Sequence, residues 1–261
     1  MVASSLAAPR PTTVALVIAH PGHELRVFRW MEQTRPMVCI LTDGSGTTGL
    51  SRVESTRRIV QDAGATMGPW QGRVRDAEVY QWLLSRSHSR FLDLVDELAG
   101  ILMASGVHTV AADAAEGFNP AHDVCRLIVN ATLARVASAG RAINSYEFAL
   151  DRSPTAPAPA SGGRIDLTLD DDALDRKLRA ADDYPELKSE VARALAMHGR
   201  VAFKAERLWR VANPFELTSQ YVGSPAYERY GADRVAAGVY STAITFTDHM
   251  APLVRALERM P

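Results

Sequence analysis

The stretch TVALVIA at residues 13–19 decides the fold, because it is an unbroken run of apolar and β-branched side chains. Such a run is typical of a strand buried on both faces of a parallel sheet. After a turn at Pro21 and Gly22, residues 23–35 (HELRVFRWMEQTR) carry apolar side chains at helical spacing. The sequence therefore predicts a strand followed directly by a helix.

The same alternation continues along the chain. Alternating strands and helices predict right-handed crossovers and a mostly parallel sheet with helices on both faces, which is a three-layer α/β fold. The expected strands are residues 37–41, 107–114 and 143–150, and the expected helices are residues 51–64, 91–104 and a segment that begins at His122.

The organisation of the chain follows from composition. Residues 1–12 are expected to be a flexible N-terminus, and residues 13–261 a single α/β domain. Residues 151–164 (DRSPTAPAPASGGR) are rich in Pro, Ala, Ser and Gly and predict a mobile loop. From about residue 165 a C-terminal extension is expected, with a short strand at 165–169 and several helices.

Composition also narrows the class of function. The 261 residues carry a formal net charge of -1, so charge alone would not hold a nucleic acid or an anionic membrane. No secretory signal and no apolar run of about 18 residues is present, and the two cysteines lie in apolar runs. These features predict a cytoplasmic protein without a nucleic-acid or membrane partner, and leave a homo-oligomer open.

Polar side chains cluster just after the expected strands. In a parallel sheet, ligands bind beyond the carboxyl ends of the strands, where loops and helix N-termini converge. Three of the seven histidines fall on that rim. The residues concerned are His20, His23 and Glu24 after the first strand, Thr42 and Asp43 after the second, and Asp113, Glu116, Asn119, His122 and Asp123 after the third.

Three imidazoles can fill three corners of a tetrahedral zinc site and leave the fourth for water or substrate. Taken singly, His20 would cap a turn, His23 would be solvated and His122 would be an ordinary polar residue. Their joint position on one rim favours a metal site formed by His20, His23 and His122. Zinc suits imidazole ligands, and another divalent transition metal is also compatible.

Three segments in order carry a family resemblance: ALVIAHPGHE at residues 15–24, LTDG at 41–44 and EGFNPAHD at 116–123. Together they resemble the LmbE/PIG-L family of zinc-dependent N-deacetylases, whose signatures are AHPDDE after the first strand and an HPDH-like segment further on. The resemblance covers residues 13 to 150. It implies a Rossmann-like sheet, a divalent metal, and hydrolysis of an N-acyl group, typically acetyl on an amino sugar.

Position by position, the resemblance transfers only in part. His20 and His122 match the two histidine ligands of the family, and His23 stands where the family has an aspartate ligand. This gives a ligand set without charge, which implies a stronger Lewis acid. Gly22 replaces the aspartate that serves as general base. Asn119 and Ala121 replace a histidine and its aspartate partner, and Asn119 can still donate a hydrogen bond to an oxyanion.

Another carboxylate would have to activate water, and the candidates are Glu24, Asp43, Glu116 and Asp123. Each also has a structural interpretation. Glu24 suits a helix N-terminus, Asp43 suits a turn before Gly44, and Asp123 suits a helix cap or a partner for a ligand histidine. Glu116 and Asp43 are therefore expected to be better candidates than Glu24.

Competing interpretations stay open at this stage. The segment GSGTTG at residues 44–49 fits the glycine pattern of a dinucleotide site, but it follows the second strand rather than the first. The leading hypothesis is a metal-dependent hydrolase that removes an N-acyl group from a sugar or sugar-containing metabolite. The alternatives are a metal enzyme with a different reaction and a carbohydrate-binding relative without turnover.

Overall fold

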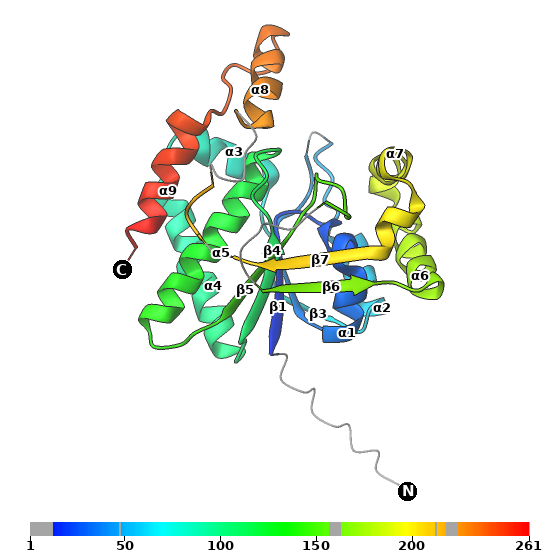
Figure 1. Ribbon diagram of the computed structural model, residues 1–261. Coiled ribbons are helices and arrows are strands. Elements are labelled where there is room, and N and C mark those ends of the chain that lie inside the picture. The colour runs from blue at the N-terminus through cyan, green and yellow to red at the C-terminus, as the bar shows by residue number, and fades with distance from the viewer. Residues whose placement is uncertain (1–12, 47, 157–162, 212, 218–223, 261) are drawn as a thin grey trace, which may run out of the picture.

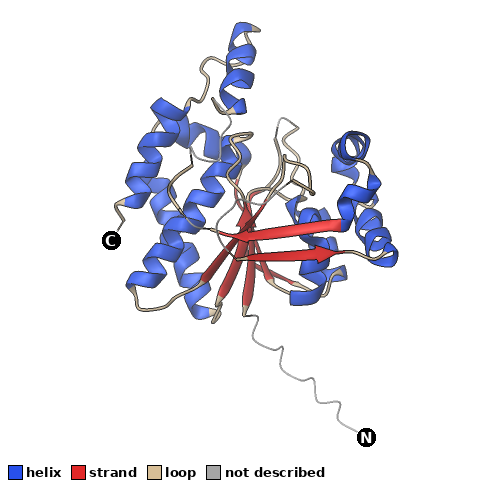
Figure 2. Ribbon diagram, viewed as in Figure 1, coloured by secondary structure: helices blue, strands red, loops and turns tan. Residues whose placement is uncertain are grey.

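The computed structural model describes residues 13–46, 48–156, 163–211, 213–217 and 224–260. The flexible N-terminus expected at residues 1–12 lies outside these ranges, as do residues 157–162 of the expected loop. Within the described chain, seven strands form one sheet in the order β3-β2-β1-β4-β5-β7-β6. Figures 1 and 2 show this sheet between two layers of helices, so the three-layer α/β fold is confirmed.

The first strand, β1 (Val14–Ile18), lies in the middle of the sheet because both of its faces are apolar. It pairs in parallel with β2 (Met37–Thr42) and with β4 (Thr109–Asp113), and β4 pairs in parallel with β5 (Asn144–Phe148). Alternate side chains of β1 enter different cores: Ala15 and Val17 on one face, Leu16 and Ile18 on the other. The carboxyl ends of these strands therefore meet along one edge.

Helices cover both faces of the sheet. One layer contains α3 (Asp76–Leu84), α4 (His88–Ala104), α5 (Pro120–Ser138) and α9 (Ala251–Glu258). The opposite layer contains the 3-10 helix η1 (His23–Val27), α1 (Phe28–Thr34), α2 (Val53–Asp62), α6 (Asp171–Asp182) and α7 (Lys188–His198). The helix expected at residues 23–35 is thus divided at Val27 into a 3-10 turn and an α-helix.

A strand and a helix that the sequence did not predict lie between α2 and α4. Strand β3 (Thr66–Val74) is the parallel edge strand beside β2, and it leads directly into α3. Its pattern is not an apolar run because exposed and buried positions are mixed, and it contains Pro69 and two glycines, which are tolerated at a sheet edge. This edge strand brings the N-terminus of α3 to the carboxyl edge of the sheet.

The C-terminal part of the chain extends the same sheet. The expected strand at 165–169 is β6 (Arg164–Thr168), and an unpredicted strand, β7 (Ala205–Arg210), pairs antiparallel with both β5 and β6. A short 3-10 turn, η2 (Pro185–Leu187), joins α6 to α7, and α8 (Ala226–Ala236) projects beyond the carboxyl edge of the sheet. None of the helices in the described ranges has the length and apolar character needed to traverse a bilayer.

Candidate metal centre

The three predicted histidines meet at the carboxyl edge of the sheet. His20 follows β1, His23 begins η1, and His122 lies in the first turn of α5. Their ring centres are 5.2 Å apart for His20 and His23, 5.0 Å for His20 and His122, and 4.6 Å for His23 and His122. Two distant stretches of chain therefore place three imidazoles in one cluster.

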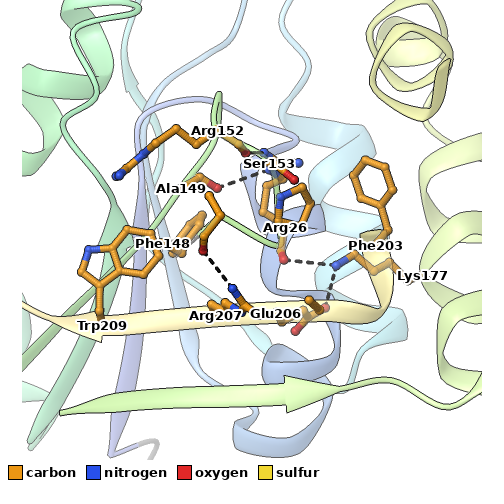
Figure 3. A pocket seen from close by; sticks show the side chains of 13 residues that line it. Arg26, Phe148, Ala149, Arg152, Ser153, Lys177, Phe203, Glu206, Arg207 and Trp209 are labelled. Carbon is orange, nitrogen blue, oxygen red and sulfur yellow. Dashed lines mark hydrogen bonds and ion pairs between the residues drawn. The ribbon is translucent and has the colours of Figure 1, made fainter. Parts of the chain in front are cut away.

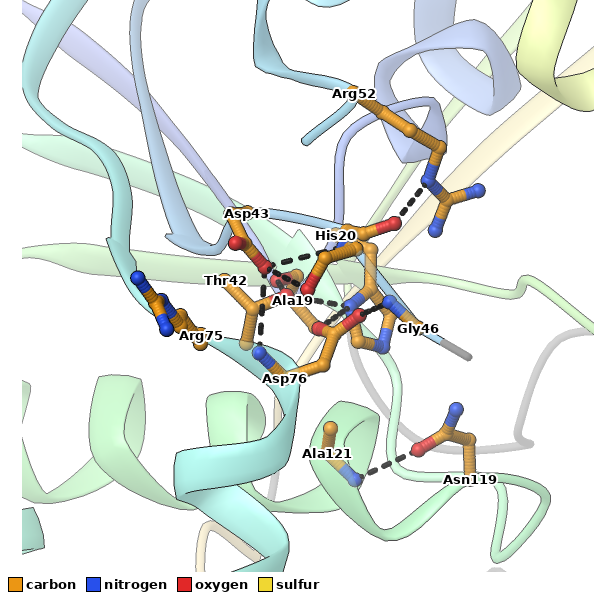
Figure 4. Close-up of polar contacts among 12 residues, drawn as sticks. Ala19, His20, Thr42, Asp43, Gly46, Arg52, Arg75, Asp76, Asn119 and Ala121 are labelled. Atoms are coloured by element: carbon orange, nitrogen blue, oxygen red, sulfur yellow. Dashed lines mark hydrogen bonds and ion pairs between the residues drawn. The ribbon is translucent and has the colours of Figure 1, made fainter. Parts of the chain in front are cut away.

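The His20 ring is held by the ends of two neighbouring strands. Its Nδ1 lies 2.6 Å from Thr42 Oγ1 and 3.0 Å from Asp76 Oδ1, and the Thr42 hydroxyl donates to the Ala19 carbonyl. Figure 4 shows these contacts around the start of α3. Because Nδ1 is occupied, Nε2 is the nitrogen left for a ligand, and it is buried without a hydrogen-bond partner.

The His23 ring is held in the same way by a carboxylate. Its Nδ1 lies 2.8 Å from Asp113 Oδ2, at the end of β4, and the same oxygen accepts the Ala19 amide. Asp113 is fully buried, and β4 is the hydrogen-bonded neighbour of β1. A carboxylate behind a ligand histidine fixes its tautomer and raises its basicity, and Asp113 is placed to do this for His23.

Burial favours the unprotonated form of the histidines in this cluster, which is the form that can bind a cation. Desolvation lowers the pKa of His20, although a hydrogen bond with Asp76 opposes the shift, and desolvation lowers the pKa of His122 well below its usual value. Both rings are therefore neutral near pH 7, with lone pairs available. The hydrogen bonds of Asp76 with His20, Thr42 and the Gly46 amide outweigh its partial burial and hold the pKa of that carboxyl well below its usual range.

The chemistry of these donors fits a divalent transition metal. Imidazoles on one tetrahedral zinc, with Zn–N distances of about 2.0–2.1 Å, have ring centres about 5 Å apart. The observed separations agree with that value, and His20 Nε2 is an orphaned polar atom inside the cluster. In the described ranges, however, no three His, Cys, Asp or Glu side chains have their donor atoms already arranged around a metal, so coordination would require these rings to turn.

Asn119 and Asp123 lie at the start of α5 beside His122. Asn119 caps the helix, and its Oδ1 accepts the Ala121 amide at 2.8 Å and the Tyr80 hydroxyl at 3.0 Å. Asp123 is fully buried, and its Oδ1 accepts the Gly117 amide at 3.2 Å. Asn119 thus retains a donor NH2 group, whereas Asp123 braces the loop before α5.

Gly22 stands where the resembling family has its general base, and the space beside it is filled by an apolar side chain. Gly22 has φ +105°, and a Cβ on it would lie 2.2 Å from Leu187 Cδ1 of η2. The neighbouring Glu24 is fully buried and accepts hydrogen bonds from the Gly22 amide and the Thr56 hydroxyl. Burial raises the pKa of Glu24. In this position Glu24 fixes the turn after β1.

The two carboxylates expected to be better bases differ in their surroundings. Glu116 accepts hydrogen bonds from the amides of residues 150–152 and from Arg152 Nε, and no hydrogen bond or ion pair joins it to the histidines in the described chain. Asp43 lies next to Thr42, and its Oδ1 accepts from Ser45 and from the Asp76 amide at 3.3 Å. Asp43 therefore lies beside Asp76, the partner of His20, without a hydrogen bond or ion pair of its own to a histidine in the described chain, whereas Glu116 anchors a loop.

Sequence reasoning missed Asp76, Tyr80 and Arg52 as members of this region. Arg52 donates from Nε to the Gly44 carbonyl, and its charge contributes to the lowered pKa of His20 and His122. Asp76 and Tyr80 were not assigned to the site because β3, which leads into their helix, was not predicted. The rule that polar residues after a strand build the site would have found Asp76, two positions beyond Val74.

A separate small cavity lies between β7, α6 and the segment after β5. Its volume is about 20 Å³, enough for one water molecule, and Figure 3 shows Arg26, Lys177, Glu206 and Trp209 among the residues that line it. Lys177 pairs with Glu206 at 2.9 Å and donates to the Arg26 carbonyl. The cavity is lined by none of the three histidines, and its polar groups are paired with one another.

Comparison with known proteins gives a fold but no family. No family model matches the sequence, and no curated protein matches it. Similar solved structures include the A40926 pseudoaglycone deacetylase Dbv21 (18% identity, TM-score 0.56, 78% of this chain and 100% of that chain). Others are a zinc-inhibited teicoplanin deacetylase Orf2 (14%, 0.52, 77% and 98%) and a deacetylase–teicoplanin complex (13%, 0.53, 77% and 100%). At these identities the chain shares the fold of glycopeptide deacetylases.

Proposed function

We propose that the chain is a metal-dependent hydrolase that removes an N-acyl group, typically acetyl, from a sugar or a sugar-containing metabolite. The observation that carries this proposal is the cluster of His20, His23 and His122, whose ring centres lie within 5.2 Å of one another. The site lies at the carboxyl edge of the sheet, where α/β enzymes bind ligands.

His20, His23 and His122 would hold the metal, which we propose is zinc or another divalent transition metal. When bound, such a cation lowers the pKa of a coordinated water and polarises an acyl oxygen. Asp113 and Asp76 would keep Nδ1 of His23 and His20 protonated, so that each ring presents Nε2.

In the proposed reaction, water adds to the acyl carbon, a C–O bond forms and the C–N bond breaks. We propose Asp43 as the base, because it follows β2 at the carboxyl edge of the sheet and its Oδ1 accepts the amide of Asp76, whose carboxylate contacts His20. It would take one proton from water and return it to the leaving nitrogen, so that the products are acetic acid and a free amine. The acid then releases its remaining proton to the solvent and becomes acetate. Asn119 would donate its NH2 group to the oxygen that gains charge, a contact worth about 3–4 kcal/mol in other hydrolases.

The similar structures support the choice of substrate class. They are deacetylases of teicoplanin biosynthesis and of the A40926 pseudoaglycone, and one is a zinc-inhibited form. We propose that the substrate of this chain is likewise an N-acylated sugar. A single domain over 13–261 is also proposed, since β6 and β7 continue the central sheet, and a cytoplasmic location stays a prediction.

One observation favours a second candidate function. Leu187 occupies the space beside Gly22, where the resembling family has its base. A metal enzyme with a different reaction, or a carbohydrate-binding relative without turnover, would have no need of a base there.

Two measurements test the proposal. The full chain, purified without chelator, should contain close to one equivalent of a transition metal, and His122→Ala should lose it. Wild-type protein should release acetate from N-acetylglucosamine derivatives, Asp43→Asn should abolish this release, and Glu116→Gln should retain it. Less than a tenth of an equivalent of metal would reject the metal site, and bound metal without acetate release would favour the second candidate.

A further inference from the structure

Helix α3 sends two side chains toward the histidine cluster. Asp76 and Tyr80 are four residues apart, a spacing that places both on one face of a helix. Asp76 Oδ1 lies 3.0 Å from His20 Nδ1, and the Tyr80 hydroxyl lies 3.0 Å from Asn119 Oδ1. One face of α3 therefore contacts both His20 and the residue that caps α5.

The Asn119 carboxamide is held by two hydrogen bonds to the same oxygen. One comes from the Ala121 amide and belongs to the helix cap, and the other comes from Tyr80. The cap bond alone allows the carboxamide plane to turn about the Oδ1···H–N direction. A second donor fixes that plane and hence the place of Nδ2, which makes no hydrogen bond among the described residues.

Tyr80 is suited to remain a donor. Burial raises the pKa of its phenol above the ordinary value, and the nearby acidic Asp76 adds to the shift, so the hydroxyl keeps its proton throughout the neutral range. Both lone pairs of Asn119 Oδ1 are then occupied, and the carboxamide cannot exchange its oxygen and nitrogen without losing two bonds.

We infer that Tyr80 is a positioning residue, which holds the Asn119 carboxamide so that its NH2 group donates to the oxygen that gains charge during hydrolysis. This inference rests on the proposed function, since it names a residue that orients a group of that site. Asn119 itself lies within one helical turn of His122, whose amide donates to the Asn119 carbonyl at 3.1 Å. A fixed donor is worth more than a mobile one because it needs no reorientation as charge develops.

Steady-state kinetics of zinc-loaded full-length protein tests the inference. Tyr80→Phe should lower kcat for acetate release about 10-fold and Asn119→Ala about 100-fold, with KM and zinc content unchanged. The double variant should lose no more than Asn119→Ala alone, because Tyr80 acts only through Asn119. Tyr146→Phe is the matched control, since its side chain packs on the face of the sheet opposite α3 and its hydroxyl makes no hydrogen bond in the described chain.

A binding measurement separates failure of this inference from failure of the proposed function. Methylphosphonate is a tetrahedral anion that imitates the charged intermediate, whereas acetate is planar. Calorimetry on the zinc-loaded protein should give Tyr80→Phe a several-fold weaker affinity for methylphosphonate and unchanged affinity for acetate. If wild-type protein binds methylphosphonate and Tyr80→Phe weakens that binding, but no acetate is released from substrates, the proposed hydrolysis fails. The orientation of the Asn119 donor by Tyr80 toward a bound anion then stands on its own.

Three results would overturn the inference. The first is equal kcat and methylphosphonate affinity in Tyr80→Phe and Tyr146→Phe. The second is a full additional loss when Tyr80→Phe is combined with Asn119→Ala. The third is a wild-type protein that neither releases acetate nor binds methylphosphonate, because no anion would then reach Asn119.

Discussion

Replacement of Gly22 by alanine should destabilise the protein through two separate effects. The backbone at Gly22 has φ +105° and ψ -18°, which L-residues rarely adopt. A Cβ at this position would also lie 2.2 Å from Leu187 Cδ1 and 3.7 Å from Tyr184 Cζ. The first effect belongs to the backbone, and the second depends on the side chain of Leu187.

The two effects can be assigned magnitudes. A non-glycine residue in such a backbone conformation costs about 1–3 kcal/mol. Overpacking in a buried site costs about 1–3 kcal/mol, and the lower end applies here because Leu187 Cδ1 is the end of a side chain that can rotate. Gly22→Ala should therefore lower the free energy of unfolding by about 2–4 kcal/mol, a large part of the roughly 5–15 kcal/mol of a typical domain.

Urea unfolding of wild type, Gly22→Ala, Leu187→Ala and the double variant measures both parts. Leu187→Ala removes the methyl group that clashes, so Gly22→Ala should cost about 1 kcal/mol less in that background, and the backbone part should remain. Gly100→Ala is the matched control. Gly100 lies in α4 with no atom within 4 Å of an added Cβ, so alanine there should be neutral or stabilise by up to about 1 kcal/mol.

Equal stability of Gly22→Ala and wild type would refute this reasoning. Strict additivity of the two substitutions would refute the steric part alone. Equal stability would mean that position 22 accepts a side chain without cost, whereas strict additivity would mean that Leu187 leaves room for a Cβ while the backbone cost remains. The measured cost therefore also tests whether this chain can carry a carboxylate where the resembling family has its base.

Three further predictions concern other residues. Asp113→Asn should weaken zinc retention about 10- to 100-fold, measured by competition with a chelator, because a neutral amide supports the His23 ring less well than a carboxylate. Burial raises the pKa of Cys39 to about 12 and that of Cys125 well above its usual value, so neither thiol should react with a disulfide reagent at pH 8 until the protein is unfolded. Glu32→Gln should destabilise by about 0.5–1 kcal/mol at pH 7 and by progressively less as the pH falls below 4.5. Ion pairs with two arginines outweigh partial burial and lower its folded pKa, so its contribution is present above the unfolded value of 4.5 and is lost as pH falls through the folded pKa; urea unfolding over a series of pH values measures the difference.

The central part of the fold was predictable because its strands are buried on both faces. The run at residues 13–19 and the strands β2, β4 and β5 all follow from apolar patterning. Strands β3 and β7 were missed, because strand pairing at or near the edge of the sheet depends on neighbours far away in the sequence. Pro69 in β3 removes a backbone donor and interrupts the apolar pattern by which the other strands were predicted.

The histidine cluster was predictable for the same reason, since the ends of parallel strands meet at one edge. The hydrogen-bond partners of these imidazole rings were not predictable from the sequence. Asp113 was visible as a polar residue after a strand, but its bond to His23 depends on β4 lying beside β1, which no local pattern states. The roles of the four candidate carboxylates were equally hidden, because the amides that bind Glu116 come from residues 150–152.

The ligand set expected from the sequence is neutral, which would make a bound metal a stronger Lewis acid. The carboxylates behind the rings change that expectation. Asp113 lies 2.8 Å from His23 Nδ1 and Asp76 lies 3.0 Å from His20 Nδ1. Two of the three imidazoles therefore have a carboxylate on the side of the ring opposite the nitrogen that would bind the metal. In the proposed site, His23 with Asp113 behind it would therefore take the place of the single aspartate ligand of the resembling family.

This replacement has a consequence for pH. An imidazole must lose its proton before it binds a metal, whereas an aspartate is already ionised well below neutrality. Zinc retention by this chain should thus fall as the pH drops, because protons compete with the metal for the imidazoles. Burial lowers the pKa of His20 and His122, so this fall should lie below the pH at which an unperturbed histidine gains its proton. His23→Asp should shift that fall to lower pH, and an unchanged profile in this variant would show that His23 does not bind the metal.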